Sequence, residues 1–251
     1  MTDGKLEGIN ITLDDVRNPP KDWVTTHLES KGKPVWTRTI DIDGHVITLT
    51  NYDAEFDFTE RHQQELIDFV RKAREFNPEL IANFKRLIFD DYQPASRYAD
   101  EEKFPSNGMR LNDGVLLFKR GQRSDIKHRT DIVSNFQGTI AHECFHFIGG
   151  EYGDAWKQAF DWHYVGENLD DWELIPVPDG SDKAYKNIKT GKLAYQGQYT
   201  NHPEWCVTDY ARMAWDDDFA DSGVIALFEP SNLEAICTQK LAVLRNIKPQ
   251  A

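Results

Sequence analysis

The feature that most constrains this chain is a pair of histidines in an apolar stretch, GTIAHECFHFIGGEYGDAW at 138–156. His142 and His146 are four residues apart, so on a helix their side chains lie on one face, one turn apart. Two neutral imidazoles placed in this way can reach one tetrahedral Zn²⁺ with bonds of ~2.0–2.1 Å. The stretch therefore predicts a helix over about 133–148 that ends at Gly149-Gly150 and has a metal-binding face.

Glu143 lies ~100° around this predicted helix from His142, which makes it a poor third ligand. In an H-E-x-x-H motif, a glutamate at this position takes a proton from a water that the metal activates. The opposite face carries a stripe of apolar side chains, which a core can bury: Phe136, Ile140, Cys144 and Phe147. The alternative interpretation is a core helix that contains two hydrogen-bonded histidines, and the apolar back face makes this less favourable.

A catalytic zinc site needs a third protein ligand and one open position. The longer pattern H-E-x-x-H-x-x-G-x-x-H stops matching at Tyr152, so a third histidine at that spacing is set aside. Asp217 is the preferred ligand, because Asp217 and Asp221 are four residues apart on a predicted helix and share a face. The acidic run 216–218 could instead be a solvated surface. The other carboxylates that remain open as ligands are Glu204, Glu151 and Asp154.

The downstream residues resemble a motif of a known family. In chain order they are Tyr210-Ala211, then Asp217-Asp218-Phe219-Ala220-Asp221-Ser222, then Phe228-Glu229-Pro230 and Leu233. This order is similar to the pattern YA…EDFAES…YxxxPxxL of the anthrax-lethal-factor-like zinc peptidases, which include the Pro-Pro endopeptidases. The resemblance covers about 110–246 and is strong at the two motifs.

The resemblance implies an α+β, zincin-like metallopeptidase fold, with a small twisted sheet, an active-site helix and a helical C-terminal part. It implies one Zn²⁺ as cofactor. The roles that it implies are metal ligands at His142, His146 and Asp217, a general base at Glu143, an acid that supports a ligand histidine at Asp221, and a hydrogen-bond donor to the oxyanion at Tyr210. This chain has Asp217 where the family has a glutamate, and the aspartate side chain is shorter. Either the helix that carries Asp217 lies nearer the zinc, or Asp217 binds the zinc more weakly.

The interval from Tyr210 to Asp217 is seven residues, which on one helix returns to nearly the same face. We expect a single domain over 1–251, with an N-terminal arm and hairpin in 1–55 and a motif-bearing core in 108–246. The first 34 residues are expected to be irregular.

Local patterns predict the remaining elements. Alternation around Asp43-Gly44 predicts a hairpin over 35–50, and Thr59 is the expected N-cap of an amphipathic helix over 59–76. The apolar run 114–121 predicts a strand, which we expect at the upper edge of the substrate cleft. The other expected elements are a strand or short helix at 84–92, a helix at 155–165, irregular or hairpin structure at 173–200, and helices at 204–228 and 231–246.

The composition limits which classes of partner and which location are expected. The net charge of −13 disfavours nucleic acid and anionic membrane surfaces. No apolar run approaches the ~20 residues that span a bilayer. The start of the sequence has no secretory signal, and three cysteines imply no disulfide framework, so a cytoplasmic location is expected, with another export route left open.

The expected function is zinc-dependent hydrolysis of a peptide or protein substrate. The alternatives are a hydrolase of the same scaffold that acts on a non-peptide or small modified-peptide substrate, and a non-catalytic zinc-binding interaction protein. The sequence leaves the oligomeric state open.

Overall fold

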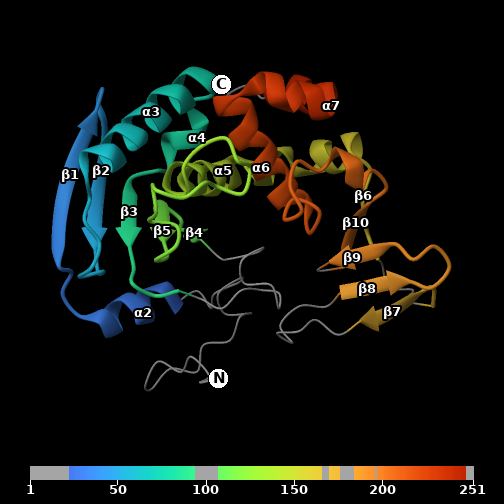
Figure 1. Ribbon diagram of the computed structural model, residues 1–251, viewed down its shortest axis with the longest axis horizontal. Coiled ribbons are helices and arrows are strands. Elements are labelled where there is room, and N and C mark those ends of the chain that lie inside the picture. Colours follow the sequence, from blue (N-terminus) through green and yellow to red (C-terminus); the bar gives the residue numbers. More distant parts are fainter. Residues whose placement is uncertain (1–22, 94–106, 166–169, 176–183, 196, 247–251) are drawn as a thin grey trace.

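The computed structural model describes residues 23–93, 107–165, 170–175, 184–195 and 197–246. The fold is α+β: the described residues form six α-helices, one short 3₁₀ helix and two five-stranded sheets. The sheets lie at opposite ends of the long axis, and most of the helices lie along one side of the molecule (Figure 1). No helix among these residues is both long enough and apolar enough to cross a bilayer.

The first sheet comes from the N-terminal half of the chain. Its strand order is β1-β2-β3-β5-β4, with bounds Trp36–Ile42, His45–Asn51, Arg86–Phe89, Gly114–Leu117 and Gly108–Arg110. The β2, β3 and β5 strands are parallel, and an antiparallel strand closes each side. The predicted hairpin over 35–50 is confirmed, because Asp43 and Gly44 adopt the positive φ angles, 54° and 85°, that a two-residue turn of this kind requires.

Part of the expected N-terminal arm is helical. Residues 1–22 of the arm lie outside the described residues, but α2 spans Trp23–Lys31. His27 of this helix is fully buried and pairs with the equally buried Asp90, which follows β3. Irregular structure was therefore the wrong prediction for 23–31, and a buried contact between His27 and Asp90 anchors this segment to the first sheet.

The predicted helix over 59–76 is confirmed as α3, Glu60–Phe76. Thr59 caps it, since its hydroxyl accepts a hydrogen bond from the backbone N–H of His62. A second, short helix, α4 (Glu79–Ala82), follows. The buried face of α3 is apolar and joins the main hydrophobic core with Leu66, Phe69, Val70 and Ala73.

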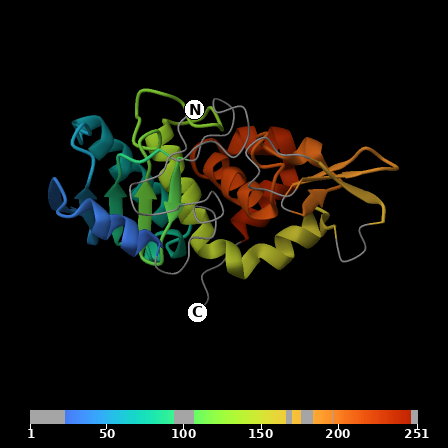
Figure 2. The same cartoon turned by 90° about the horizontal axis from the view of Figure 1, so that it is seen from below.

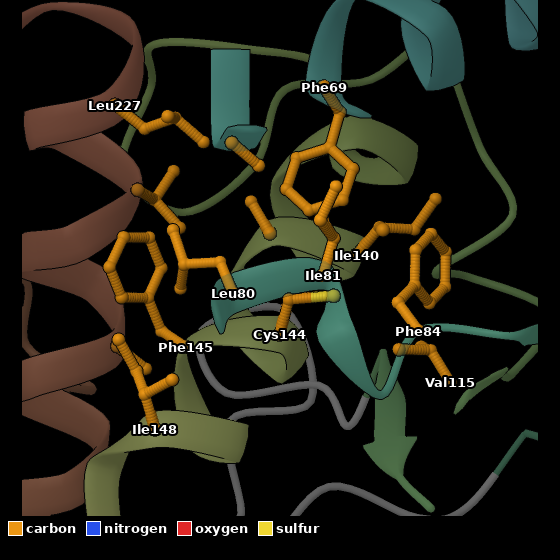
Figure 3. Packing of buried hydrophobic residues seen from close by; sticks show 14 of the residues in the cluster. Phe69, Leu80, Ile81, Phe84, Val115, Ile140, Cys144, Phe145, Ile148 and Leu227 are labelled. Atoms are coloured by element: carbon orange, nitrogen blue, oxygen red, sulfur yellow. The ribbon is translucent and has the colours of Figure 1, made fainter. Parts of the chain in front are cut away.

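The H-E-x-x-H segment lies in α5, Asn135–Ala159, which passes through this core. Ile140 and Cys144 point among side chains from α3, α4 and the first sheet (Figure 3). Both are fully buried, as the sequence predicts for the back of this helix, whereas Phe147 is only partly buried. Cys144 thus acts as a small core residue.

The prediction that this helix ends at Gly149-Gly150 is wrong, because α5 continues to Ala159. Glycines further along α5 and on the helix packed against it allow a close approach. A Cβ atom on Gly153 would lie 2.4 Å from the ring of Trp215. Trp215 begins α6, Trp215–Phe228, and a Cβ atom on Gly223 of α6 would lie 2.5 Å from the ring of Phe145. These glycines let α5 and α6 approach closely along much of their length.

The second sheet is formed by residues that lie between α5 and α6 in the sequence. The helix expected at 155–165 ends at Ala159, and the chain turns through Asp161, with φ of 53°, into a strand. The strand order is β6-β10-β9-β8-β7, antiparallel throughout, with bounds Trp162–Tyr164, Gln198–Thr200, Leu193–Tyr195, Ala184–Asn187 and Trp172–Ile175. The described residues of 173–200, for which irregular or hairpin structure was expected, lie mostly in antiparallel strands. Figure 2 shows α5 extending from the first sheet towards the second.

The prediction of a helix over 204–228 is wrong for the first half of this range. A 3₁₀ helix, η1, spans Pro203–Trp205, turns follow, and helical structure begins again only at Trp215. The next helix, α7 (Pro230–Arg245), confirms the prediction for 231–246. The break between α6 and α7 falls at Glu229, as predicted, because a proline cannot continue the preceding helix.

Candidate metal centre

Three side chains from α5 and α6 converge on one point. His142, His146 and Asp217 each offer one ligand atom, and these atoms all lie within 4.8 Å of one another. The two Nε2 atoms are 3.0 Å apart. Asp217 Oδ1 lies 3.5 Å from Nε2 of His142 and 3.9 Å from Nε2 of His146. The group could hold a metal ion.

The spacing of the three atoms fits a small cation. With bonds of ~2.0–2.1 Å at tetrahedral angles, Zn²⁺ places its donors roughly 3.3 Å apart, and the separations found here, from 3.0 to 3.9 Å, lie around that value. Two imidazoles and a carboxylate also suit zinc chemically. The shorter side chain of Asp217 is accommodated because the glycines described above bring α6 close to α5.

Asp221 contacts the side of His142 that faces away from the other two candidate ligands. The two carboxylates lie one turn apart on α6, and Asp221 Oδ1 accepts a hydrogen bond from Nδ1 of His142 at 2.8 Å. This contact leaves Nε2 of the imidazole facing the other two donors, which is the common arrangement around a metal-binding histidine. Burial opposes ionisation of Asp221, but the charge of Arg129 holds the pKa of its carboxyl well below the usual range.

The acidic run 216–218 is not a solvated face. Asp217 and Asp218 are both buried, and they point to different sides of α6. Asp218 pairs with Lys240 of α7, and it accepts hydrogen bonds from the indole N–H groups of Trp156 at 3.1 Å and Trp162 at 3.4 Å. Two of the three acids therefore have distinct buried partners: the sequence predicted the position of Asp217 beside the histidines, but not the pairing of Asp218 with Lys240.

The two imidazoles differ in how they bind protons. Burial disfavours the charged form of His142, but hydrogen bonds to Asp217 and Asp221 outweigh it and raise its pKa to about 9. Burial lowers the pKa of His146 to about 4, and the neighbouring charge of His142 contributes. In the absence of metal the pair therefore holds one proton over the neutral pH range, and this proton must leave when a cation binds.

Glu143 is buried next to His142, with its side chain and backbone together only 9% exposed. Burial raises the pKa of its carboxyl, against the charges of His142 and Arg129. A carboxylate whose pKa is raised towards neutrality is better matched to taking up a proton.

Tyr210 lies near the centre, but not for the reason that the sequence suggested. It belongs to the turns before α6, so the helical argument from its seven-residue spacing to Asp217 is wrong. Its ring centroid is nevertheless 6.2 Å from that of His142. The turn thus places the phenol ring near the imidazole of His142.

Arg129 is the main residue that the sequence analysis missed. It lies in a turn before α5 and donates from Nε to both oxygens of Asp221, at 3.0 and 2.9 Å. Its Nη2 atom lies 2.9 Å from Nδ1 of His142. The sequence carried no signal for this contact, because the arginine is 92 residues from Asp221 and belongs to neither motif.

The strand expected at the upper edge of the cleft is not at an edge. β5, which forms from the run 114–121, lies between β3 and β4, and β4 is the outermost strand on this side among the described residues. Arg110, at the end of β4, donates a hydrogen bond to the backbone carbonyl of His146. The outer strand that contacts α5 near the two histidines is therefore β4.

The other candidate ligands lie away from the group. Glu204 is exposed and bonds to His202 at 3.1 Å. Glu151 is exposed on α5 beyond the ligands, and the Asp154 side chain is 97% exposed and pairs with Lys157. None of the three contributes to the His142, His146 and Asp217 group.

Comparison of the chain with protein-family models, with curated proteins and with solved structures finds no match.

Proposed function

We propose that this chain is a zinc-dependent metallopeptidase. The observation that carries the proposal is the convergence of His142, His146 and Asp217 within 4.8 Å, with Glu143 buried beside them. A bound zinc would polarise the substrate carbonyl and lower the pKa of a water molecule to ~7. A metal site that only stabilises the fold needs no buried carboxylic acid of this kind, which favours a catalytic role.

The side chains around the group have distinct roles in this proposal. Glu143 takes a proton from the attacking water and passes it to the leaving amine. Tyr210 donates a hydrogen bond to the oxygen that becomes negatively charged in the transition state. Asp221 keeps His142 oriented through Nδ1.

The outer strand of the first sheet suggests how a substrate lies. An extended peptide can add to a strand edge through backbone hydrogen bonds, with side-chain pockets that set specificity. β4 is the outermost described strand and is held to α5 by the Arg110 hydrogen bond to His146. A peptide or protein is therefore the proposed substrate, and nucleic acid and membrane surfaces are not proposed as partners.

The test combines metal analysis with cleavage of a peptide library, using Glu143→Gln as the matched variant. We expect one zinc per chain in both proteins, and a cleavage rate that falls about 10²–10⁴-fold in the variant. Equal zinc content with no Glu143-dependent cleavage of any peptide would reject the peptidase. Cleavage of ester or small modified-peptide substrates alone would favour the alternative hydrolase.

A further inference from the structure

Arg129 contacts three side chains of the candidate centre. We propose that Arg129 is a positioning residue of the centre: its guanidinium holds Asp221 against His142 and holds the ring of Tyr210 beside the same imidazole. This inference rests on the proposed function, but its first test uses metal binding alone.

The turn that carries Arg129 is anchored to α5. His128 is buried, its backbone N–H donates to the carbonyl of Val133 at 3.0 Å, and its carbonyl accepts from Asp131 at 2.8 Å. Its ring packs so tightly on the first turns of α5 that a Cβ atom on Gly138 would lie 2.3 Å away. Arg129 therefore extends into the site from a backbone that is fixed relative to the ligand helix.

The contact with Asp221 is the first half of the role. Asp221 is fully buried, and its oxygens accept hydrogen bonds from Arg129, from His142 and from the hydroxyl of Thr208 at 2.6 Å. A buried carboxylate is costly unless a cation is paired with it. Without Arg129, Asp221 would lose the two contacts from Nε that orient its carboxylate, and Nδ1 of His142 would lose an acceptor held in position.

The contact with Tyr210 is the second half. The guanidinium carbon lies 4.0 Å from the centre of the Tyr210 ring, which is a cation–π contact. The turn that carries this tyrosine is linked to the same cluster through Thr208. The Thr208 hydroxyl donates a hydrogen bond to Asp221 and accepts one from the backbone N–H of Ala211 at 2.9 Å. One guanidinium thus joins the support of a metal ligand to the position of the phenol.

A lysine in place of Arg129 cannot make the contacts with both Asp221 and Tyr210. Both carboxylate contacts come from Nε of Arg129, while Nη2 lies against the imidazole and the guanidinium carbon lies over the Tyr210 ring. An ammonium carries the same charge, but it is a compact donor without a planar surface. Arg129→Lys should therefore retain the fold and the charge while it loosens the contact with the tyrosine.

The first experiment measures zinc affinity by competition with a chromophoric chelator, and the visible spectrum of the cobalt-loaded protein. Arg129→Met should weaken zinc binding about 10–100-fold and change the cobalt spectrum. The double variant Arg129→Met with Asp221→Asn should bind no more weakly than Asp221→Asn alone, because both act through His142. The control is Arg123→Met, in the same loop, whose side chain is 53% exposed and pairs with Asp125.

Arg129→Met with wild-type zinc affinity, or effects that simply add in the double variant, would overturn the assignment. If the single variant does not fold, the double variant, which removes both charges, and Arg129→Lys decide the same question. Circular dichroism and thermal unfolding of each variant establish that it is folded.

The second experiment measures kcat at saturating zinc. Arg129→Lys should lower kcat more than it raises KM in the wild-type background, and it should have a smaller effect in the Tyr210→Phe background, where the hydroxyl is absent. Equal effects in both backgrounds would contradict the tyrosine half of the proposal. Absence of Glu143-dependent cleavage in the wild type would reject the peptidase and leave the zinc measurements to decide on Arg129.

Discussion

Two carboxylates that are neighbours on α6 lie in two different kinds of buried charge cluster. Asp217 faces His142 and His146, and three potential ligand atoms converge there. Asp218 faces Lys240, and each of these two side chains is only 1% exposed. The first cluster could exchange the proton on His142 for a metal cation, whereas the second is already closed by the ammonium group of Lys240.

The role of each carboxylate in this acidic run therefore depends on which side chains it faces. Consecutive residues of a helix point about 100° apart, so one turn of α6 can serve both the site and the fold. The Asp218 cluster joins α6 to α7 and, through the indole of Trp156, to α5. It therefore contributes to the stability of the fold, whereas Asp217 faces the two histidines.

The largest expected effect on stability comes from the closed cluster. Lys240→Met leaves Asp218 buried without its cation, and the free energy of unfolding in urea should fall by about 3–5 kcal/mol. The double variant with Asp218→Asn should recover most of this loss. Zinc affinity of the folded single variant should stay near that of the wild type. If Lys240→Met is as stable as the wild type, or if the folded variant loses its zinc affinity, the distinction between the two clusters does not hold.

The open cluster should instead respond to pH. His142, with a pKa of about 9 without metal, must lose a proton when zinc binds, whereas His146, with a pKa of about 4, is already neutral. Zinc affinity should therefore rise with pH by about tenfold per unit below pH 9, or about 100-fold from pH 6 to pH 8. Calorimetric titration across this range measures it. An affinity that does not change between pH 6 and 8 would show that no ligand proton is displaced.

A smaller effect is expected where α5 and α6 touch. A methyl group at Gly223 would meet the ring of Phe145 at 2.5 Å, so Gly223→Ala should destabilise the fold by about 1–3 kcal/mol and weaken zinc binding as α6 shifts. Gly150 has no neighbour within 4 Å at its Cβ position, and Gly150→Ala should stabilise α5 by about 0.5–1 kcal/mol. Thermal unfolding of both variants tests this. Similar effects of the two substitutions would contradict the role assigned to the close approach.

The elements that sequence predicted well are those set by local chemistry. The turn at Asp43-Gly44, the cap at Thr59 and the break at Glu229 each follow from a few adjacent residues. The histidine pair belongs to the same group, since its geometry follows from helical spacing. Asp217 was found because its four-residue spacing to Asp221 and a family resemblance both pointed to it.

The predictions that failed depend on contacts between distant segments. Gly149-Gly150 suggested a helix end because the sequence does not show that α6 packs there and that α5 continues past it. Tyr210 reaches the centre from a turn rather than from a helix. Arg129 and Lys240 have no local signal, since each finds its carboxylate only after the helices are assembled.

The most direct test of the central claim is the anomalous diffraction of zinc-loaded crystals at the zinc absorption edge. The account predicts one peak with Nε2 of His142, Nε2 of His146 and an oxygen of Asp217 each within ~2.2 Å. A peak at other side chains, or no peak near the two histidines at stoichiometric zinc, would contradict it.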